Sequence, residues 1–147
     1  MQKVKSAKVE VNGKLVSNIS RGLLLLVGIE DDDHKEDIDW LCKKIINLRI
    51  FEDESEKMNL SIKKVKGAIL AVSQFTLHAN IKKGNRPSYN RAANAEMAEP
   101  IFELFRKELS QQLDKEVKSG IFGEAMQVSL INDGPVTLIM DSKNKDL

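Results

Sequence analysis

The 147-residue sequence is poor in residues from which many active sites are built, with one cysteine, two histidines and one tryptophan. A single cysteine excludes an intramolecular disulfide and any metal cage made of several cysteines, and two histidines cannot complete a three-histidine zinc site. No apolar run approaches the roughly 20 residues that a membrane-spanning helix needs, and the basic N-terminus lacks the hydrophobic segment of a secretory signal. We therefore expect a cytoplasmic protein with no membrane segment and no metal centre.

Standard catalytic and cofactor-binding motifs are missing as well. The chain contains no GxSxG nucleophile elbow, no GxxxxGK[ST] phosphate loop and no HExxH helix. Its eight glycines are too scattered for a dinucleotide-binding fingerprint. The sequence therefore predicts no bound cofactor, and it offers no conventional nucleophile with an adjacent base.

Length and charge fit a single domain over residues 1–147. The 23 basic and 22 acidic side chains leave a net charge of +1, which argues weakly against a protein dedicated to duplex DNA. The charges are nevertheless segregated along the chain. Residues 30–39 are mostly acidic, whereas residues 80–91 contain no acid and carry four basic side chains: Lys82, Lys83, Arg86 and Arg91.

Periodicity and turn signals predict an alternation of strands and helices. Alternating apolar residues at Val9 and Val11, followed by Asn12-Gly13, predict a hairpin, and the apolar run 23–29 predicts a strand buried on both faces. Apolar residues at helical spacing predict the helices. The expected elements are helices over 34–48 and 95–113, strands over 15–19, 68–77, 126–131 and 136–140, and a polar loop over 51–59.

Local signals mark the ends of these elements. Asp33 with Glu36 resembles a capping box at the start of the first helix, and Pro100 should lie in the first turn or at a kink of the second. The turn signal of residues 132–135 should join the last two strands, and the tail from Lys143 should fray. Together these elements predict an α+β fold with two main helices and a barrel-like, largely antiparallel sheet.

The rare residues have ordinary explanations in this pattern. Cys42 lies on the apolar stripe of the first helix, which favours a buried structural thiol over a nucleophile. Trp40 lies on the polar face, where it could cover a neighbouring segment or contact a partner subunit. His34 falls in the acidic helix start and should be solvated. His78 could act as a general base, although a structural role is the more common one for a histidine in this position.

Two short segments could carry chemistry. Ser73-Gln74-Phe75-Thr76 places hydroxyls, an amide and a ring that can stack on a base at a strand end, where groups are held rigidly yet exposed. An ordinary strand ending in threonine would explain the same residues. The second segment is Gly134-Pro135, for which a plain hairpin turn is the simplest explanation, since only about 5–6% of X–Pro bonds are cis in folded proteins.

Taken together, these segments resemble the D-aminoacyl-tRNA deacylase family, whose pattern is SQFTL in mid-chain and NxGPVT near the C-terminus. Residues 73–77 read SQFTL and residues 132–137 read NDGPVT. The resemblance runs from about Gln2 to Ser142 and includes further matches at 47–54, 57–60, 82–88 and 122–128. A sibling family that acts on L-alanine mischarged to threonine tRNA has another motif in place of SQFTL, so the D-specific branch is favoured.

The resemblance implies a two-fold homodimer with active sites at the subunit interface. Such an enzyme hydrolyses the ester that joins a D-amino acid, or glycine, to the 3′-terminal adenosine of tRNA. A Gly-cisPro pair from the other subunit, here Gly134-Pro135, would block the side chain of an L-amino acid with its carbonyls and would let glycine pass. The pocket for the adenosine and the aminoacyl group would be lined by Ser73, Gln74, Phe122 and Met126.

Two mechanisms are compatible with these residues. Thr76 could act as the nucleophile, although the sequence assigns no histidine or lysine to activate it. Alternatively, the 2′-hydroxyl of the terminal adenosine assists the attack, while the backbone amides of Phe75 and Thr76 bind the developing oxyanion. We favour this second route, which the resemblance also implies. The acceptor-stem phosphates would be contacted by four side chains, unless these form only a solvated loop: Lys82, Lys83, Arg86 and Arg91.

The sequence departs from the family pattern at its N-terminus. Lys3 stands where the family has an arginine that helps to hold the Gly-cisPro loop, and lysine lacks the planar fork of arginine. Family members also begin a few residues earlier, so we expect either a shortened first strand or a start upstream of Met1. The rival interpretations are a nucleic-acid-binding module without catalysis and a protein with a purely structural role.

Overall fold

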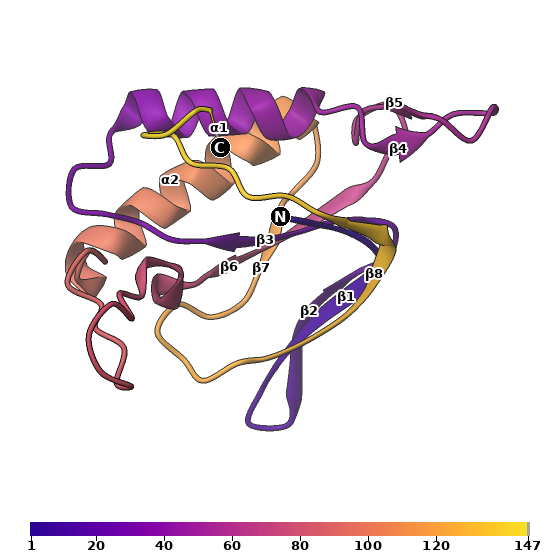
Figure 1. The fold of residues 1–147 in the computed structure, drawn as a ribbon. Helices are drawn as coiled ribbons and strands as arrows, with labels where there is room; N and C mark the ends of the chain where they lie inside the picture. Colours follow the sequence, from indigo (N-terminus) through magenta and orange to yellow (C-terminus); the bar gives the residue numbers. More distant parts are fainter. Residues whose placement is uncertain (147) are drawn as a thin grey trace.

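The computed structural model describes residues 1–146, which form a six-stranded sheet, a small two-stranded hairpin and two long helices (Figure 1). The helices are α1 (Lys35–Asn47) and α2 (Ala95–Leu113), and a short 3₁₀ helix spans Phe75–His78. The strands are β1 (Gln2–Val11), β2 (Lys14–Ile19), β3 (Gly22–Val27), β4 (Phe51–Glu52), β5 (Met58–Leu60), β6 (Ala68–Ser73), β7 (Lys118–Ser119) and β8 (Gln127–Thr137).

Strand β1 organises the sheet, because it pairs antiparallel with β2, β3 and β8. In contrast, β3 and β6 run parallel, as do β6 and β7. Parallel neighbours require a crossover, and the crossovers here contain α1 between β3 and β6 and α2 between β6 and β7. The predicted α+β fold with two helices and a barrel-like sheet is confirmed, and these two crossovers make the sheet mixed.

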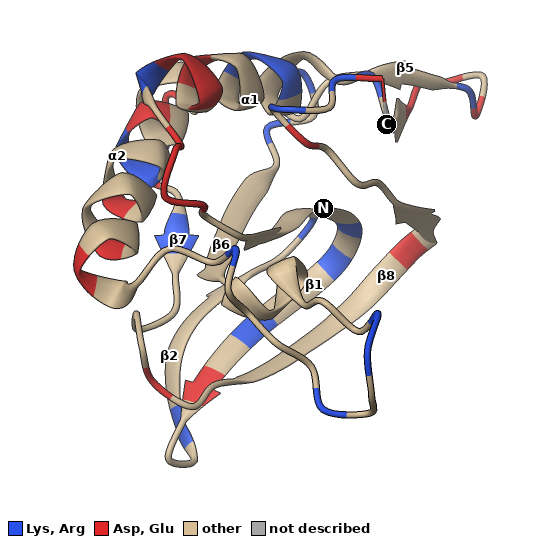
Figure 2. Ribbon diagram, turned by 60° about the vertical axis from the view of Figure 1, so that its left-hand side comes forward, with Lys and Arg blue, Asp and Glu red and all other residues tan. Residues whose placement is uncertain are grey.

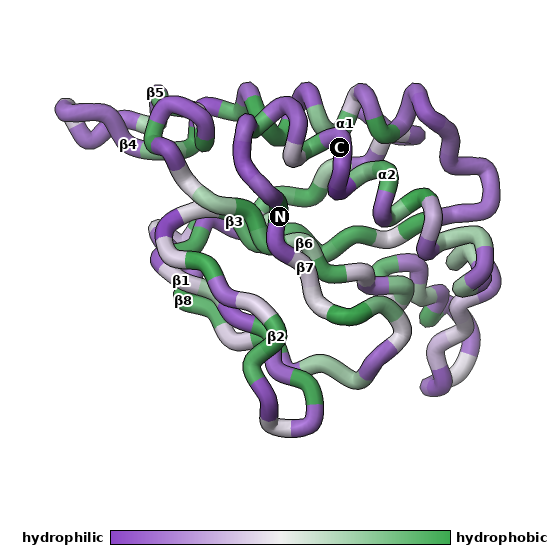
Figure 3. Tube along the Cα trace, turned by 180° about the vertical axis from the view of Figure 1, so that it is seen from behind, coloured by the Kyte–Doolittle hydropathy of each residue, from purple (hydrophilic) through white to green (hydrophobic). Residues whose placement is uncertain are grey.

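The central strands are buried on both faces, as the apolar run near residues 23–29 predicts. Leu23 and Leu25 belong to a core cluster shared with both helices, whereas Leu24 belongs to a second cluster with residues of β1 such as Val4. This alternation follows from the two-residue period of a strand. Figure 3 shows hydrophobic residues concentrated along β3 and β6, with hydrophilic residues on the outer side of α1.

Helix α1 begins one residue later than the sequence pattern predicts. Its N-cap is His34, whose backbone N–H donates to Asp37 Oδ2 at 2.9 Å. Asp33 instead accepts a hydrogen bond from the backbone N–H of Glu30, also at 2.9 Å, and so orders the preceding turn. The proposed pairing of Asp33 with Glu36 was therefore wrong, because the capping box is formed by His34 and Asp37.

Two predicted boundaries also differ from the structure. The strand expected over 68–77 ends at Ser73, and the chain then winds into the 3₁₀ helix, with Leu77 N–H donating to Gln74 O at 3.3 Å. The polar loop expected over 51–59 contains β4 and the first two residues of β5. Its turn is organised by Asp53, whose side chain accepts hydrogen bonds from the backbone of Lys57 and from the side chain of Asn59.

The hairpin predicted around residues 132–135 is wrong, because β8 continues through this segment to Thr137. The side-chain amide of Asn132 donates to the carbonyl oxygens of Lys3 at 2.9 Å and Val136 at 3.0 Å. These bonds span an irregular part of the β1–β8 ladder, where the register shifts on both sides of Val4. The turn-like residues are thus kept alongside β1 and do not reverse the chain.

The rare residues mostly behave as predicted. Cys42 is fully buried, and this burial raises the pKa of its thiol to about 12, which confirms a structural thiol. His34 is exposed. Trp40 has Lys44 and Lys145 over its ring, so it covers a neighbouring segment, the C-terminal one. Within residues 1–146, no helix has the length and apolar character needed to cross a membrane.

Candidate active site

The SQFTL segment forms a rigid corner at the end of β6. The backbone N–H of Gln74 donates to Val27 O at 2.7 Å, which ties the corner to the end of the parallel neighbour β3. Phe75 then begins the 3₁₀ helix with 55% of its surface exposed. The segment is therefore anchored by the sheet at one end and accessible at the other.

Two backbone donors remain free at this corner. The first amides of a helix have no partner within the helix, and those of Phe75 and Thr76 have no acceptor anywhere in residues 1–146. The side chain of Thr76 is engaged, because its Oγ1 accepts a hydrogen bond from Gln74 Nε2 at 2.5 Å. Within the same residues, no basic side chain hydrogen bonds to that hydroxyl. The corner thus offers two N–H donors and no activated nucleophile.

A basic loop (residues 79–91) follows the 3₁₀ helix and folds back beside it. Asn80 and Ser88 exchange two backbone hydrogen bonds of 2.7 and 3.0 Å, so the loop is closed in its middle. The ring of Tyr89 meets that of Phe75 edge-on, with centroids 5.1 Å apart. Figure 2 shows this loop projecting from the body with its basic residues in blue, and the exposed ones include Lys82, Lys83 and Arg86.

Phe122 and Met126 lie beyond the same edge of the sheet. They follow β7, which runs parallel to β6. The segments that follow β6 and β7 therefore leave the sheet at neighbouring strand ends. Both side chains are half-buried. Phe122 packs against Phe102 of α2, with ring centroids 6.2 Å apart, and Met126 packs against the second core cluster. Only part of each side chain is therefore exposed at this edge of the sheet.

His78 is held in place by its neighbours rather than directed at Thr76. Its Nδ1 lies 3.3 Å from Glu30 Oε1, and its Nε2 lies against Gly28, where an added Cβ would be only 2.6 Å away. Glu30 also pairs with Arg91 at 2.7 Å. These contacts support a structural role for the histidine.

Gly134 and Pro135 lie far from this corner within one chain. They stand in β8 opposite the start of β1, and Lys3 of β1 pairs with Leu23 near the start of β3. The corner follows β6 and lies beside the end of β3, at Val27, which pairs with Ser73 and is four residues beyond Leu23, or about 13 Å at 3.3 Å per residue. In Figure 1, the turn after β6 and the end of β8 lie near opposite ends of β3. The bond between Gly134 and Pro135 is cis.

Lys3 anchors the segment that contains Gly134. Its side chain is only 1% exposed, and its Nζ lies 2.5 Å from Glu52 Oε1 and 3.4 Å from Asp133 Oδ2. The hydrogen bond from Lys3 lowers the pKa of Glu52 below its ordinary value. Lys3 also lies 5.9 Å from the ring centroid of Phe51. The lysine therefore contacts both the hairpin β4–β5 and the residue next to Gly134.

Several residues around the site were not found from the sequence. Glu52 and Asp133 were recognised only from their contacts with Lys3, and Glu30 only from its contacts with His78 and Arg91. Such ion pairs join residues far apart in the chain, so no local sequence pattern marks them. Tyr89 offered a usable signal, since it is the only aromatic residue in a basic loop that follows the exposed Phe75.

Comparison with known proteins agrees with these motifs. The family model described as D-Tyr-tRNA(Tyr) deacylase matches residues 1–141. The chain belongs to this deacylase family. Two proteins named D-aminoacyl-tRNA deacylase, from Flavobacterium psychrophilum and Bacteroides thetaiotaomicron, are each 58% identical to it over 99% of this chain and 97% of theirs. Family membership makes the chain an enzyme of the hydrolase class and confirms the resemblance seen in its sequence.

Solved structures show the same deacylase fold. One, described as c-Myc DNA Unwinding Element Binding Protein, has a TM-score of 0.87, 41% identity and 93% coverage of both chains. Another, described as a probable eukaryotic D-amino acid tRNA deacylase, has a TM-score of 0.77 at 16% identity, with 91% of this chain and 92% of the other covered. The second likeness shows that the deacylase architecture is kept when most of the sequence has changed.

Proposed function

We propose that this chain hydrolyses the ester of D-aminoacyl-tRNA, and of glycyl-tRNA, to free the amino acid and the tRNA. The observation that carries the proposal is the pair of free amides at Phe75 and Thr76, on an exposed corner anchored to two strands. Amides fixed in this way can stabilise the oxyanion that forms when an ester is attacked. Residues 1–147 would act as one domain, in the cytoplasm, where such tRNAs are found.

The attack itself is assigned to the tRNA. Thr76 lacks a basic partner and already accepts a hydrogen bond from Gln74, so it is poorly prepared to act as a nucleophile. The 2′-hydroxyl of the terminal adenosine is adjacent to the ester and needs only correct positioning. Ser73, Gln74, Phe122 and Met126 would line the pocket that supplies this positioning. The Thr76 route remains the second mechanism.

Rejection of L-amino acids is assigned to Gly134 and Pro135 of a second subunit in a homodimer. The separation of about 13 Å along β3 between the two motifs supports this assignment, since one chain does not bring them together. The carbonyls of the pair would then occupy the space of an L side chain. Glycine has no side chain and would be accepted.

The basic loop would bind the phosphates of the acceptor stem. Lys82, Lys83 and Arg86 support this role, because they are exposed and form no ion pair within residues 1–146. Arg91 is 67% exposed and could contribute as well, although it already pairs with Glu30. Phosphate contacts of this kind weaken steeply as salt is raised.

The decisive test compares hydrolysis of D-tyrosyl-tRNA and L-tyrosyl-tRNA by the purified protein. We expect rapid release of D-tyrosine and an uncatalysed rate for the L-ester. Retention of both esters at the uncatalysed rate would refute the proposed activity. D-tyrosyl-tRNA whose terminal nucleoside is 2′-deoxyadenosine tests the mechanism. Unchanged hydrolysis of that ester would exclude assistance by the 2′-hydroxyl and favour Thr76 as the nucleophile.

The role of the amides can be tested with two variants at one position. Phe75→Pro removes the amide N–H at the first residue of the 3₁₀ helix, where proline is tolerated, and Phe75→Ala removes the ring but keeps the amide. We expect kcat for Phe75→Pro to fall about 10²–10³-fold relative to Phe75→Ala. Equal rates for the two variants would exclude this amide as an oxyanion donor.

The cross-subunit assignment can be tested by mixing subunits. Asn132→Ala removes the hydrogen bonds that hold the Gly134 segment, so its homodimer should begin to hydrolyse the L-ester. In a mixed dimer, one subunit carries Asn132→Ala and the other carries Phe75→Pro. The only intact pocket belongs to the Asn132→Ala subunit and faces the intact Gly134 segment of the Phe75→Pro subunit. This dimer should again reject the L-ester. If the mixed dimer hydrolyses the L-ester as the Asn132→Ala homodimer does, the segment acts within its own chain. Light scattering should give a mass twice the 16.5 kDa of one chain.

A second candidate function is nucleic-acid binding without catalysis. The relative at 41% identity is described by a name that refers to a DNA unwinding element, and a basic loop could contact DNA phosphates in this chain too. This candidate predicts binding of duplex DNA and no turnover of either ester. The D-ester assay, with duplex DNA as a competitor, therefore separates the two candidates.

A further inference from the structure

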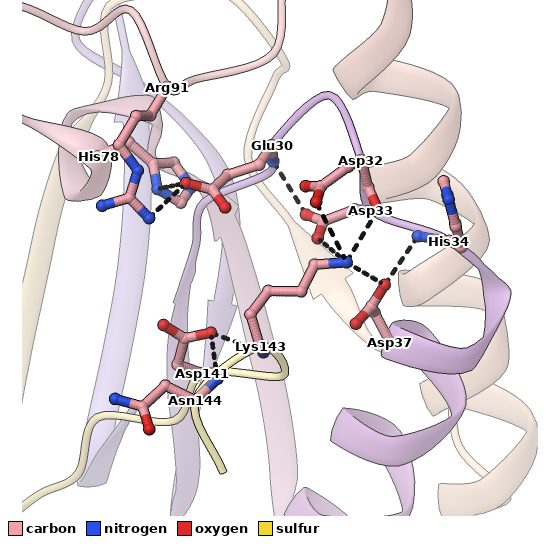
Figure 4. Close-up of polar contacts among 10 residues, drawn as sticks. All are labelled: Glu30, Asp32, Asp33, His34, Asp37, His78, Arg91, Asp141, Lys143 and Asn144. Carbon is pink, nitrogen blue, oxygen red and sulfur yellow. Dashed lines mark hydrogen bonds and ion pairs between the residues drawn. The ribbon is translucent and has the colours of Figure 1, made fainter. Parts of the chain in front are cut away.

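Glu30 lies between the two ends of the basic loop. Its carboxylate Oε1 is 2.7 Å from Arg91 Nη2, at the far end of the loop, and 3.3 Å from Nδ1 of His78, which immediately precedes it (Figure 4). Its side chain is only 16% exposed. One buried carboxylate thus contacts the residues on both sides of a projecting loop.

The backbone fastens the loop at the same place. Glu30 forms a β-bridge with Ala92, and Ala93 N–H donates to Ile29 O at 2.9 Å. On the other side, Gln74 N–H donates to Val27 O, so the 3₁₀ helix is attached to the same stretch of chain after β3. The segment 27–30 therefore carries both the corner with the free amides and the end of the basic loop.

We propose that Glu30 is a positioning residue of the deacylase, which acts through His78 on the catalytic corner and through Arg91 on the basic loop. The inference rests on the proposed function. His78 is the last residue of the 3₁₀ helix, and its ring is confined between Glu30 and Gly28. Fixing the ring restricts rotation of the turn, and this would hold the free amides of Phe75 and Thr76 in one orientation.

Arg91 receives a different role from its neighbours under this proposal. Its charge is compensated by Glu30 at 2.7 Å, whereas Lys82, Lys83 and Arg86 have no acidic partner among the described residues. A compensated guanidinium releases fewer counterions when tRNA binds, so Arg91 contributes mainly as a tether of the loop. The loop would then present its three free cations in a fixed direction.

The bend that carries Glu30 is itself held by the acidic helix start. The backbone N–H of Glu30 donates to Asp33, and Lys143 of the C-terminal segment lies 3.6 Å from Asp33 and 2.8 Å from Asp37 (Figure 4). Lys143 also donates to the carbonyl oxygen of Asp32 at 2.8 Å. These contacts fix the backbone of Glu30 independently of its carboxylate, so a side-chain substitution can be interpreted without loss of the bend.

The test uses Glu30→Gln, with Glu36→Gln as the matched control. Both remove one negative charge from the same acidic segment, but Glu36 is exposed and makes no ion pair within residues 1–146. For Glu30→Gln we expect kcat on D-tyrosyl-tRNA to fall about ten- to a hundred-fold, since displacement of positioned groups by about 1 Å can cost this much. The control should keep the wild-type kcat and KM. Equal kcat for the two variants would overturn the proposal.

The proposed role of Arg91 as a tether of the basic loop is tested by the salt dependence of KM. Arg91→Gln should raise KM several-fold without changing the slope of log KM against log salt, and Arg91→Lys, which keeps the pair with Glu30, should restore KM. Lys82→Gln should instead reduce that slope by roughly 0.7–0.9, as expected for one lost phosphate contact. A slope for Arg91→Gln reduced as much as for Lys82→Gln would make Arg91 a phosphate contact and refute the tether.

Hydrogen exchange separates failure of this inference from failure of the proposed activity. The amides of Asn80 and Ser88 report closure of the loop without any substrate. They should exchange at least tenfold faster in Glu30→Gln than in Glu36→Gln. If the wild-type protein were inactive, faster exchange would still support the tether, and unchanged exchange would refute it.

Discussion

Removing the carboxylate beside the buried Lys3 should destabilise the protein more than removing the lysine itself. Lys3 is 1% exposed, whereas Glu52 and Asp133 keep 39% and 26% of their side chains exposed. The Glu52→Gln variant therefore leaves a buried ammonium with one carboxylate at 3.4 Å. The Lys3→Met variant leaves two carboxylates that water can still reach.

The expected losses follow from this asymmetry. Removing one partner of a fully buried ion pair costs about 3–5 kcal/mol, and the partial exposure of Glu52 and the remaining Asp133 reduce this to about 2 kcal/mol. A domain of this size loses about 2–4 °C of Tm for each kcal/mol, so Glu52→Gln should melt about 4–8 °C lower. Lys3→Met should lose less than about 1 kcal/mol, since apolar replacement of buried ions is often nearly neutral.

The assay is urea unfolding followed by circular dichroism for both single variants and the double variant. The double variant should be more stable than Glu52→Gln alone, because it no longer contains an uncompensated buried charge. Lys3→Met at least as destabilising as Glu52→Gln, or a double variant with additive losses, would refute this reasoning. Circular dichroism in the native state would verify that each variant is folded before the addition of urea.

The same pair predicts a pH dependence with a definite sign. The hydrogen bond from Lys3 lowers the pKa of Glu52 in the folded state, so the folded protein holds the proton less tightly than the unfolded chain. The resulting stability is present above the range in which an unfolded glutamate titrates, and it is lost as the pH falls through the lowered pKa. The free-energy difference between wild type and Glu52→Gln should therefore shrink towards zero in acid.

Three further predictions concern other parts of the fold. Because burial raises the pKa of Cys42 to about 12, iodoacetamide should label the thiol only as fast as the protein unfolds, which mass spectrometry can follow against a urea-unfolded sample. Gly28→Ala would place a methyl group 2.6 Å from His78 Nε2 and should cost about 1–3 kcal/mol of unfolding free energy; this cost should be smaller when His78→Ala is already present, because only the contact with Leu77 Cβ at 3.3 Å then remains. The backbone N–H of Lys57 donates to Asp53 and lowers the pKa of that carboxyl. The NMR chemical shift of the Lys57 amide should therefore change as Asp53 titrates, at a pH below that of a free aspartate. A titration at the pH of a free aspartate would contradict this contact.

Elements whose residues specify their own structure were predictable from the sequence. The apolar run of β3 and the helical stripe through Cys42 required no knowledge of distant residues, since burial on both faces and helical periodicity are local patterns. The two family motifs were likewise readable because each is contiguous. The corner at Phe75 was located by its residue types, but its 3₁₀ conformation was not predicted.

Features that depend on distant partners were mispredicted or missed. Residues 132–135 have the composition of a turn, yet the bond from Asn132 to Lys3 O keeps them extended beside β1. The partners of the buried lysine are 49 and 130 positions away in the chain, so no local pattern pairs them. Glu30 was counted as one acid of a charged segment, and only its distance to Arg91 separates it from its neighbours.

The position of Trp40 determines what intrinsic fluorescence can report. It is the only tryptophan in the chain, and the ammonium groups of Lys44 and Lys145 lie 5.9 and 5.3 Å from its ring. Because Lys145 belongs to the C-terminal segment, the emission is an optical probe of whether that segment lies on α1. A change in emission on addition of tRNA would then signal movement of the tail, whereas occupancy of the pocket would call for a second fluorophore, introduced near Tyr89.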